Sequence, residues 1–116
     1  LKAVRGYLGA ALFSRDGKML GGVTEVLELN FQIAGTLFNN ISIIAANLSR
    51  EAGFGLIDLI QMNSEKGVIL CKTFSVGAGS LSMVLVIEKN ANITLAKHHL
   101  EKVCAEIQRN QSLTID

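Results

Sequence analysis

The sequence predicts an α+β domain built on one antiparallel sheet. Segments of strand-like hydrophobicity follow one another across short turns, and two long stretches have helical periodicity. Their order is strand, strand, helix, strand, strand, strand, helix, which is typical of α+β architecture. We therefore expect a single five-stranded antiparallel sheet, with the long central helix on one face and the C-terminal helix on the other.

Composition limits what this domain can bind. The chain has 116 residues, which suits one domain, and its 18% of charged residues is below the ~25% that is usual for soluble domains. This shortfall favours a surface that a partner covers. A net charge of +1, with one Tyr and no Trp, gives neither a basic footprint nor stacking platforms, so we expect no nucleic-acid partner. No apolar run reaches the ~18 residues of a membrane span.

The two cysteines are placed as core residues. Cys71 falls in a strand pattern and Cys104 on the apolar stripe of a helix, where a small buried thiol is commoner than a disulfide. This usage, with no signal peptide before the first strand, favours the reducing cytoplasm. The chain begins with Leu1 rather than Met, so we expect it to be a piece of a longer protein.

A hairpin opens the domain. Residues 7–15 are small and apolar, Asp16-Gly17 is a strong two-residue turn signal, and residues 18–24 return. Both alternating sets of the first strand are apolar, which predicts a central strand that is buried on both faces.

Residues 31–50 predict the long central helix, with Asn30 as its N-cap and Gly53 as the left-handed residue after its end. At ~100° per residue the helix has a broad apolar arc, which we expect to cover the sheet. That arc consists of Ile33, Ala34, Leu37, Phe38, Ile41, Ile44, Ala45 and Leu48. The opposite face is small and uncharged: Gly35, Thr36, Asn39, Ser42, Ile43 and Ala46. Such a face suits close contact with a second backbone, which we assign to another copy of the chain.

The second half of the chain predicts three strands and a helix. The strands cover residues 56–63, 68–74 and 81–88, and the helix runs from about residue 91 or 92 to 108. The apolar stripe of this helix consists of Ile93, Ala96, Leu100, Val103, Cys104 and Ile107. Residues 109–116 read as a polar tail, so the expected domain is 1–108.

These features resemble the roadblock/dynein light chain family. The order of elements is similar, as is the opening Leu1-x-x-Val4-x-Gly6-Tyr7-x-Gly9-Ala10 with its Asp16-Gly17 hairpin. The last helix resembles the family's "anlglar..L" pattern in Asn92-Ile93-Thr94-Leu95-Ala96-Lys97-x-x-Leu100. Family members usually begin with a further helix on the sheet. Here only residues 1–5 could be its last turn, so we expect that helix to be largely absent from this sequence, either lost or lying upstream.

The resemblance implies a homodimer, or a dimer with a paralogue, in which the central helices lie side by side and the strand after them pairs across the dimer. It also implies a scaffold or regulator of Ras-like small GTPases, or a dynein-associated light chain, and it offers no catalytic motif. The interface that we expect comprises Gly35, Thr36, Asn39, Ser42, Ile43, Ala46, Arg50, Leu56, Asp58, Ile60 and Met62. Arg50 would clamp the helix end, and Asp58 would either recognise a partner or guard a sheet edge.

Other candidate sites have simpler structural explanations. Adjacent residues on a helix point ~100° apart, so His98 and His99 cannot share a face, and no Cys, Asp or Glu completes a metal site with them. Cys71 lacks the helix N-terminus that would activate a thiol. Residues 77–80 resemble a phosphate loop, but a strand follows them instead of a helix. We read them as a hairpin turn.

Three functional hypotheses remain. The first is a non-enzymatic dimeric scaffold or regulator of a Ras-like GTPase, or of a dynein-type motor complex, with no cofactor and no metal. The alternative is a small-ligand sensor of profilin-like fold, which the sequence supports less because no convergent polar cluster is visible. A thiol or metal enzyme using Cys71 or the histidines has the least support.

Overall fold

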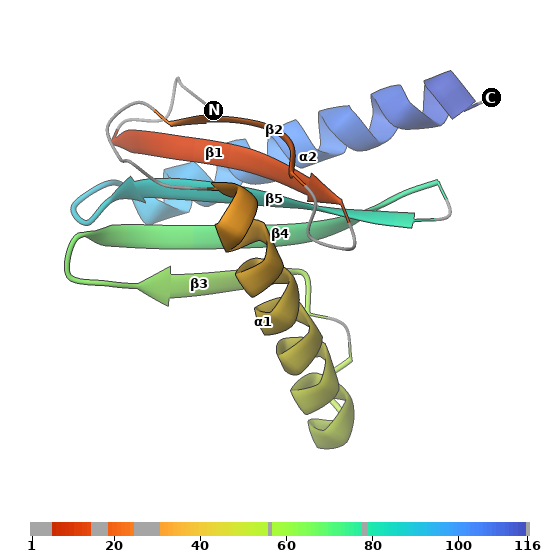
Figure 1. The fold of residues 1–116 in the computed structure, drawn as a ribbon, viewed down its shortest axis with the longest axis horizontal. Helices are drawn as coiled ribbons and strands as arrows, with labels where there is room; N and C mark the ends of the chain where they lie inside the picture. Colours follow the sequence, from red (N-terminus) through yellow and green to blue (C-terminus); the bar gives the residue numbers. More distant parts are fainter. Residues whose placement is uncertain (1–5, 15–18, 25–30, 56, 78, 116) are drawn as a thin grey trace.

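The computed structural model describes residues 6–14, 19–24, 31–55, 57–77 and 79–115, and side chains within 6–14, 20, 40–55, 57–77 and 79–110. The elements in chain order are β1 (Tyr7–Ser14), β2 (Met19–Thr24), α1 (Phe31–Ala52), β3 (Leu59–Asn63), β4 (Gly67–Val76), β5 (Gly79–Glu88) and α2 (Ile93–Ile115). The strands form one five-stranded sheet in the order β2-β1-β5-β4-β3, and every neighbouring pair is antiparallel (Figure 1). The prediction of an α+β fold with an antiparallel sheet and two helices is confirmed.

β1 is an interior strand, as its two apolar sets predict. Leu8, Ala11 and Phe13 belong to the core on one face of the sheet. Tyr7, Ala10 and Leu12 pack into the core on the other face. The register of β1 with β5 shifts between Tyr7 and Gly9, which puts Tyr7 on the same face as Ala10 and Leu12. The turn that we predict at Asp16-Gly17, the N-cap at Asn30 and the remnant helix at residues 1–5 lie outside the described residues.

α2 covers one face of the sheet. Its apolar stripe packs against β4 and β5, with Ala96 and Leu100 fully buried and Cys104 only 2% exposed. The side chain of Asn92 caps the helix, since its Oδ1 accepts a hydrogen bond from the backbone N of Leu95 at 3.0 Å. The stripe predicted from the sequence is confirmed. The predicted helix end at residue 108 is wrong, because the helix continues to Ile115 through the segment that we expected to be a tail.

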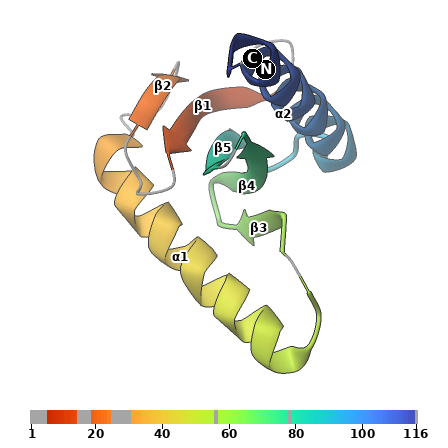
Figure 2. The same ribbon diagram turned by 90° about the vertical axis from the view of Figure 1, so that its right-hand side faces the viewer.

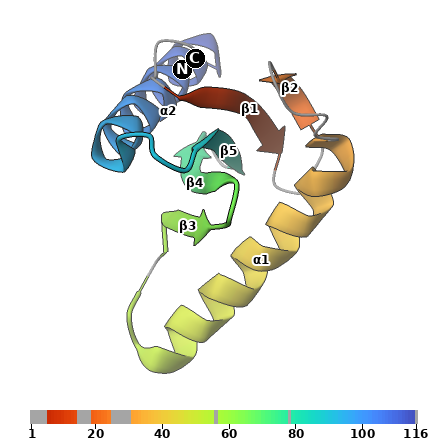
Figure 3. The ribbon, with the colours of Figure 1, turned by 90° about the vertical axis from the view of Figure 1, so that its left-hand side faces the viewer.

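α1 lies over the opposite face, where Ile41 packs with Cys71, Val84 and Val86. Figures 2 and 3 show that α1 crosses this face at an angle. Its first turns lie near β1 and β2, and its last turns project beyond β3. α1 is therefore held to the sheet along only part of its length.

α1 ends in a Schellman motif. Gly53 adopts a φ of 73°, its N–H donates to the Arg50 carbonyl at 3.2 Å, and the N–H of Phe54 donates to the Ser49 carbonyl at 2.9 Å. The predicted left-handed role of Gly53 is confirmed. The Ser49 hydroxyl then donates to the carbonyl of Gly55 at 2.5 Å and ties the connection to β3 back onto the helix.

Candidate functional site

The exposed side of α1 is apolar. Ile43, Ile44 and Leu48, here called the α1 outer stripe, are 51%, 66% and 69% exposed. On the sheet side of the helix, Ser49 is buried and Ala45 is half-buried. Ile44 and Leu48 lie one turn apart on the helix, and Ile43 points about 100° away from Ile44. Several exposed large aliphatic side chains on one element often mark an interaction surface. The α1 outer stripe is therefore the first candidate for an interaction surface.

This arrangement corrects one expectation for the central helix. Ile44 and Leu48 were expected to cover the sheet, and they are largely exposed instead. Contact of Ser42 and Ala46 with a second copy stays a prediction; within the protomer both residues line a cavity. Helical periodicity tells which residues share a face. It does not tell which of two uncharged faces of the helix the sheet will take.

A further apolar group follows the helix. Phe54 is 84% exposed and Ile57 is 39% exposed in the connection between α1 and β3. In a Schellman motif the residue at the position of Phe54 frequently packs back onto the last turn of the helix. The positions it could contact here are Ser49 and Leu48, and both Phe54 and Leu48 remain largely exposed. Phe54 thus extends the apolar surface of the α1 outer stripe toward β3.

β3 is an edge strand of the sheet. Ile60 and Met62, which the sequence assigned to the interface, are half-buried and pack into the core on the α1 face. Asp58 forms an ion pair with Lys72, with 3.3 Å between Oδ2 and Nζ, and its side chain is 75% exposed. The open backbone edge of β3 is thus available, whereas the side chains of Ile60 and Met62 are largely occupied within the protomer.

The remaining predicted interface residues lie partly beyond the described side chains. Gly35, Thr36 and Asn39 fall within the helical backbone of α1, but their side chains are outside the described set, as is the whole of Leu56. Arg50 is exposed near the end of α1, and its guanidinium donates a hydrogen bond to Asn47 Oδ1.

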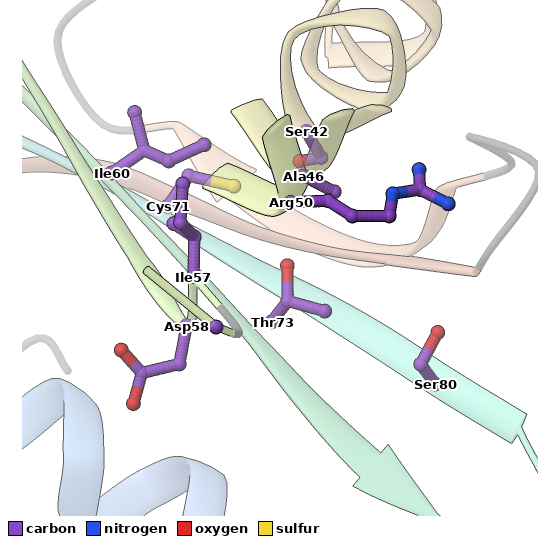
Figure 4. Close-up of a pocket in the computed structure, with 10 residues that line it drawn as sticks. Ser42, Ala46, Arg50, Ile57, Asp58, Ile60, Cys71, Thr73 and Ser80 are labelled. Atoms are coloured by element: carbon purple, nitrogen blue, oxygen red, sulfur yellow. The ribbon is translucent and has the colours of Figure 1, made fainter. Parts of the chain in front are cut away.

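A cavity of about 640 Å³ lies between α1, the connection after it, and strands β3 to β5 (Figure 4). We call it the α1 cavity. Ala46, Ile57 and Ile60 contribute apolar wall, and Arg50 and Asp58 are its charged lining residues. Figure 4 shows the carboxylate of Asp58 directed away from the space beside Arg50, which is consistent with its ion pair to Lys72.

Two polar groups meet in the wall of the α1 cavity. Figure 4 shows the Ser42 oxygen and the Cys71 sulfur facing one another. Burial raises the pKa of the Cys71 thiol above its usual 9.0, and the neighbouring Ser42 hydroxyl acts in the opposite direction. Ser42 Oγ is itself buried without a hydrogen bond of good geometry among the described residues. A neutral thiol and an unsatisfied hydroxyl therefore line this wall.

A row of hydroxyl groups that was not predicted from the sequence lies on the same face of the sheet. Thr73 is paired directly with Ser82 in the β4–β5 register, with 3.2 Å between their hydroxyl oxygens, and Ser75 is paired with Ser80. Thr73 and Ser80 line the α1 cavity. The signal was present in the sequence, because alternate residues at the end of each strand are Thr or Ser, but pairing them requires the register of the hairpin.

Among the described residues we find no metal site and no activated cysteine. His98 and His99 sit on α2 with their ring centroids 6.1 Å apart, and the described part of the chain contains no cluster of three or more His, Cys, Asp or Glu suited to a metal ion. Cys71 and Cys104 are both free and buried, as predicted. No helix in the described ranges has the length and apolar character needed to cross a membrane.

Comparison with known proteins relates the chain by fold. No family model and no curated protein matches it. Among solved structures, MglB of Myxococcus xanthus is similar at a TM-score of 0.78 and 12% identity, over 89% of this chain and 81% of that one. A Roadblock/LC7 domain from Streptomyces avermitilis is similar at 0.80 and 11%, over 94% and 88%. An MglB described with a tetrameric arrangement is similar at 0.80 and 19%, over 94% and 79%.

These neighbours, one of which is a Roadblock/LC7 domain, superimpose on most of the chain. At such low identities the likeness establishes architecture. The resemblance seen in the sequence is thus confirmed in the folded chain, which has the roadblock fold.

Proposed function

We propose that the protein is a non-enzymatic scaffold or regulator that acts as a dimer and binds a Ras-like small GTPase, or a dynein-type motor complex, in the cytoplasm. The observation that carries the proposal is the α1 outer stripe. Three large aliphatic side chains stand more than half exposed on a helix that projects past the edge of its own sheet.

The first support is energetic. Covering the exposed parts of Ile43, Ile44 and Leu48 contributes on the order of 1 kcal/mol for each side chain. Phe54 adds a larger aromatic surface close by, at the end of the same helix. A two-fold axis brings the same patch from both copies together, so each contribution is counted twice.

The second support is the open edge of the sheet. β3 follows α1 directly in the chain and has no neighbour on its outer side among the described strands. An exposed edge presents unpaired N–H and C=O groups, which favour pairing with another strand. Pairing two copies of β3 would place the projecting α1 helices over the joined sheet. The interface would then combine the α1 outer stripe with residues that the sequence assigned to it, such as Ile43, Arg50 and Asp58.

The GTPase part of the proposal comes from the roadblock resemblance, which the fold supports. The solved neighbours include one MglB described with a tetrameric arrangement, so self-association is recorded for a protein of this architecture. We infer that the dimer, rather than either subunit alone, provides the surface that a GTPase recognises.

Size-exclusion chromatography with light scattering tests the dimer. We expect a dimer mass for the wild type at micromolar concentration. Ile44→Asp and Leu48→Asp each place a charge in the buried contact and should weaken association about tenfold or more. Leu95→Asp is the matched control, because Leu95 is a 45% exposed leucine on α2. It should keep the wild-type mass.

A monomeric wild type would contradict the dimer, and unchanged masses for both α1 variants would contradict its location. Co-purification with candidate small GTPases, each loaded with GDP or with a GTP analogue, tests the second part. We expect retention by the wild-type dimer and loss with Leu48→Asp. A stable dimer that retains no GTPase in either nucleotide state would leave the dimer standing and refute the regulator role.

A further inference from the structure

We propose that the α1 cavity binds a small amphiphilic carboxylate, with its apolar tail inside the cavity and its anionic head beside Arg50. This inference goes beyond the proposed dimer. Arg50 and Asp58 belong both to the α1 cavity and to the interface expected from the sequence, so the ligand would bind next to that interface. The volume of about 640 Å³ lies within the ~300–1,000 Å³ that is typical of small-molecule sites.

The inner wall suits an apolar tail. Ala46, Ile57 and Ile60 contribute aliphatic surface, and the Cys71 thiol is neutral, since burial raises its pKa. An aliphatic chain in the cavity would contact the part of the sheet that α1 leaves uncovered.

The polar groups are gathered on one side. Figure 4 shows Arg50 extending across the space next to Thr73 and Ser80, whose hydroxyls point into it. Arg50 donates to Asn47, which leaves further N–H groups of its guanidinium for another acceptor. Among the described residues no carboxylate forms an ion pair with Arg50. One cation beside two hydroxyl groups matches a single carboxylate head.

Ser42 lies in the inner wall, where its hydroxyl faces the Cys71 sulfur (Figure 4). Eight residues of α1, about 12 Å of helix rise, separate Ser42 from Arg50, so the tail of the ligand would lie beside Ser42. The head group is therefore assigned to Arg50 with Thr73 and Ser80.

Isothermal titration calorimetry of the full chain tests the proposal, with sodium decanoate below its micelle concentration as the probe. We expect saturable binding of one decanoate per chain. Decyltrimethylammonium has the same tail with a positive head, so it should bind at least tenfold more weakly. Equal binding of the two amphiphiles would overturn the role of Arg50.

Two variants locate the ligand. Ala46→Phe fills the cavity from an exposed helix position and should abolish binding, and Arg50→Gln should weaken decanoate about tenfold while leaving decyltrimethylammonium unchanged. Arg109→Gln, on the exposed surface of α2, is the matched control and should bind like the wild type. Circular dichroism checks that each variant is folded.

Cysteine alkylation followed by mass spectrometry gives a second readout. Decanoate should slow labelling of Cys71, which lines the cavity, and should leave Cys104 on α2 unaffected. Absence of saturable decanoate binding, or equal protection of both cysteines, would overturn the proposal. Light scattering on the same samples reports the dimer separately, so a monomer that binds decanoate refutes the dimer and supports the ligand site.

Discussion

The two cysteines show how a single residue type is used in both cores. Cys104 lies on the sheet-facing side of α2, and Cys71 lies on β4 in the core beneath α1, so the two thiols are on opposite faces of one sheet. Burial raises the pKa of Cys104 to about 11, and the positive charge of Lys72 counteracts this only in part. Both thiols therefore stay protonated at neutral pH and act as small apolar groups.

This pKa predicts a dependence of stability on pH. The unfolded thiol ionises near 9.0 and the folded Cys104 thiol near 11, so the unfolded state loses its proton first as the pH rises. The stabilisation is complete below pH 9 and is lost between about pH 9 and 11. We expect the free energy of unfolding to fall from pH 8 to pH 10 by on the order of 1 kcal/mol more in the wild type than in Cys104→Ala.

Urea denaturation at the two pH values measures this difference. Comparing the two proteins cancels the titration of lysines and of the single tyrosine, which both retain. Parallel declines in the wild type and Cys104→Ala would contradict a buried neutral thiol at this position.

The two helices are held to the sheet in different ways. α2 inserts Ala96, Leu100 and Cys104 into a core of large aliphatic residues. In the part of α1 whose side chains are described, residues 40–52, Ile41 packs on the opposite core, whereas Ile43, Ile44 and Leu48 are exposed. We therefore expect the α2 layer to contribute more to the stability of the protomer than this half of α1. α1 is the element whose packing remains to be completed by something else.

Truncation of one leucine tests how much the packing of α2 contributes to the free energy of unfolding. Leu100 is fully buried, so Leu100→Ala removes apolar contacts and leaves a cavity, which should cost about 2–5 kcal/mol. Leu95→Ala on the same helix, at a position that is 45% exposed, should cost less than about 1 kcal/mol. Chemical denaturation of both variants gives the comparison, and equal losses would show that α2 does not anchor the fold as described.

At the scale of the whole molecule, three incomplete features lie together. The α1 outer stripe, the exposed Phe54 and the open edge of β3 are consecutive in the chain, and Figures 1 and 2 show that α1 and its connection project at the β3 edge of the sheet. A second copy placed along this edge would cover all three at once. Because one partner covers all three features, we prefer a symmetric dimer to a separate partner for each feature.

A proline in β3 tests pairing across this edge. The Asp58 carbonyl accepts from Thr73 N at 2.9 Å, so by strand alternation the backbone groups of Gln61 point to the open side. Gln61→Pro should leave the pairing of β3 with β4 intact and weaken the dimer about tenfold or more, because it removes an outward N–H.

Gln61→Ala is the control, since it keeps the N–H, and it should associate like the wild type. Analytical ultracentrifugation over a concentration series gives both dissociation constants. Equal constants for the two variants would contradict strand pairing and would leave the helix contact as the only interface to consider.

Local patterns in the sequence determined much of this fold. Period-2 and helical periodicities record which side chains share a face, so they predicted the interior position of β1 and the apolar stripe of α2. The glycine after the last helical turn predicted the left-handed residue at Gly53. Each of these depends on neighbours within a few residues of chain. The end of α2 was placed too early because a polar sequence can continue a helix once the preceding turns are anchored.

Only the tertiary structure decided how α1 is turned. Both of its faces are uncharged, and whether Ile44 and Leu48 or Ser42 and Ala46 meet the sheet depends on packing against strands that are distant in the sequence. The same holds for the α1 cavity, because Ser42, Cys71, Thr73 and Ser80 come together only through the crossing of α1 and the register of β4 with β5. The sequence by itself determined the elements and their order, and long-range packing decided which side of α1 meets the sheet and which stays in water.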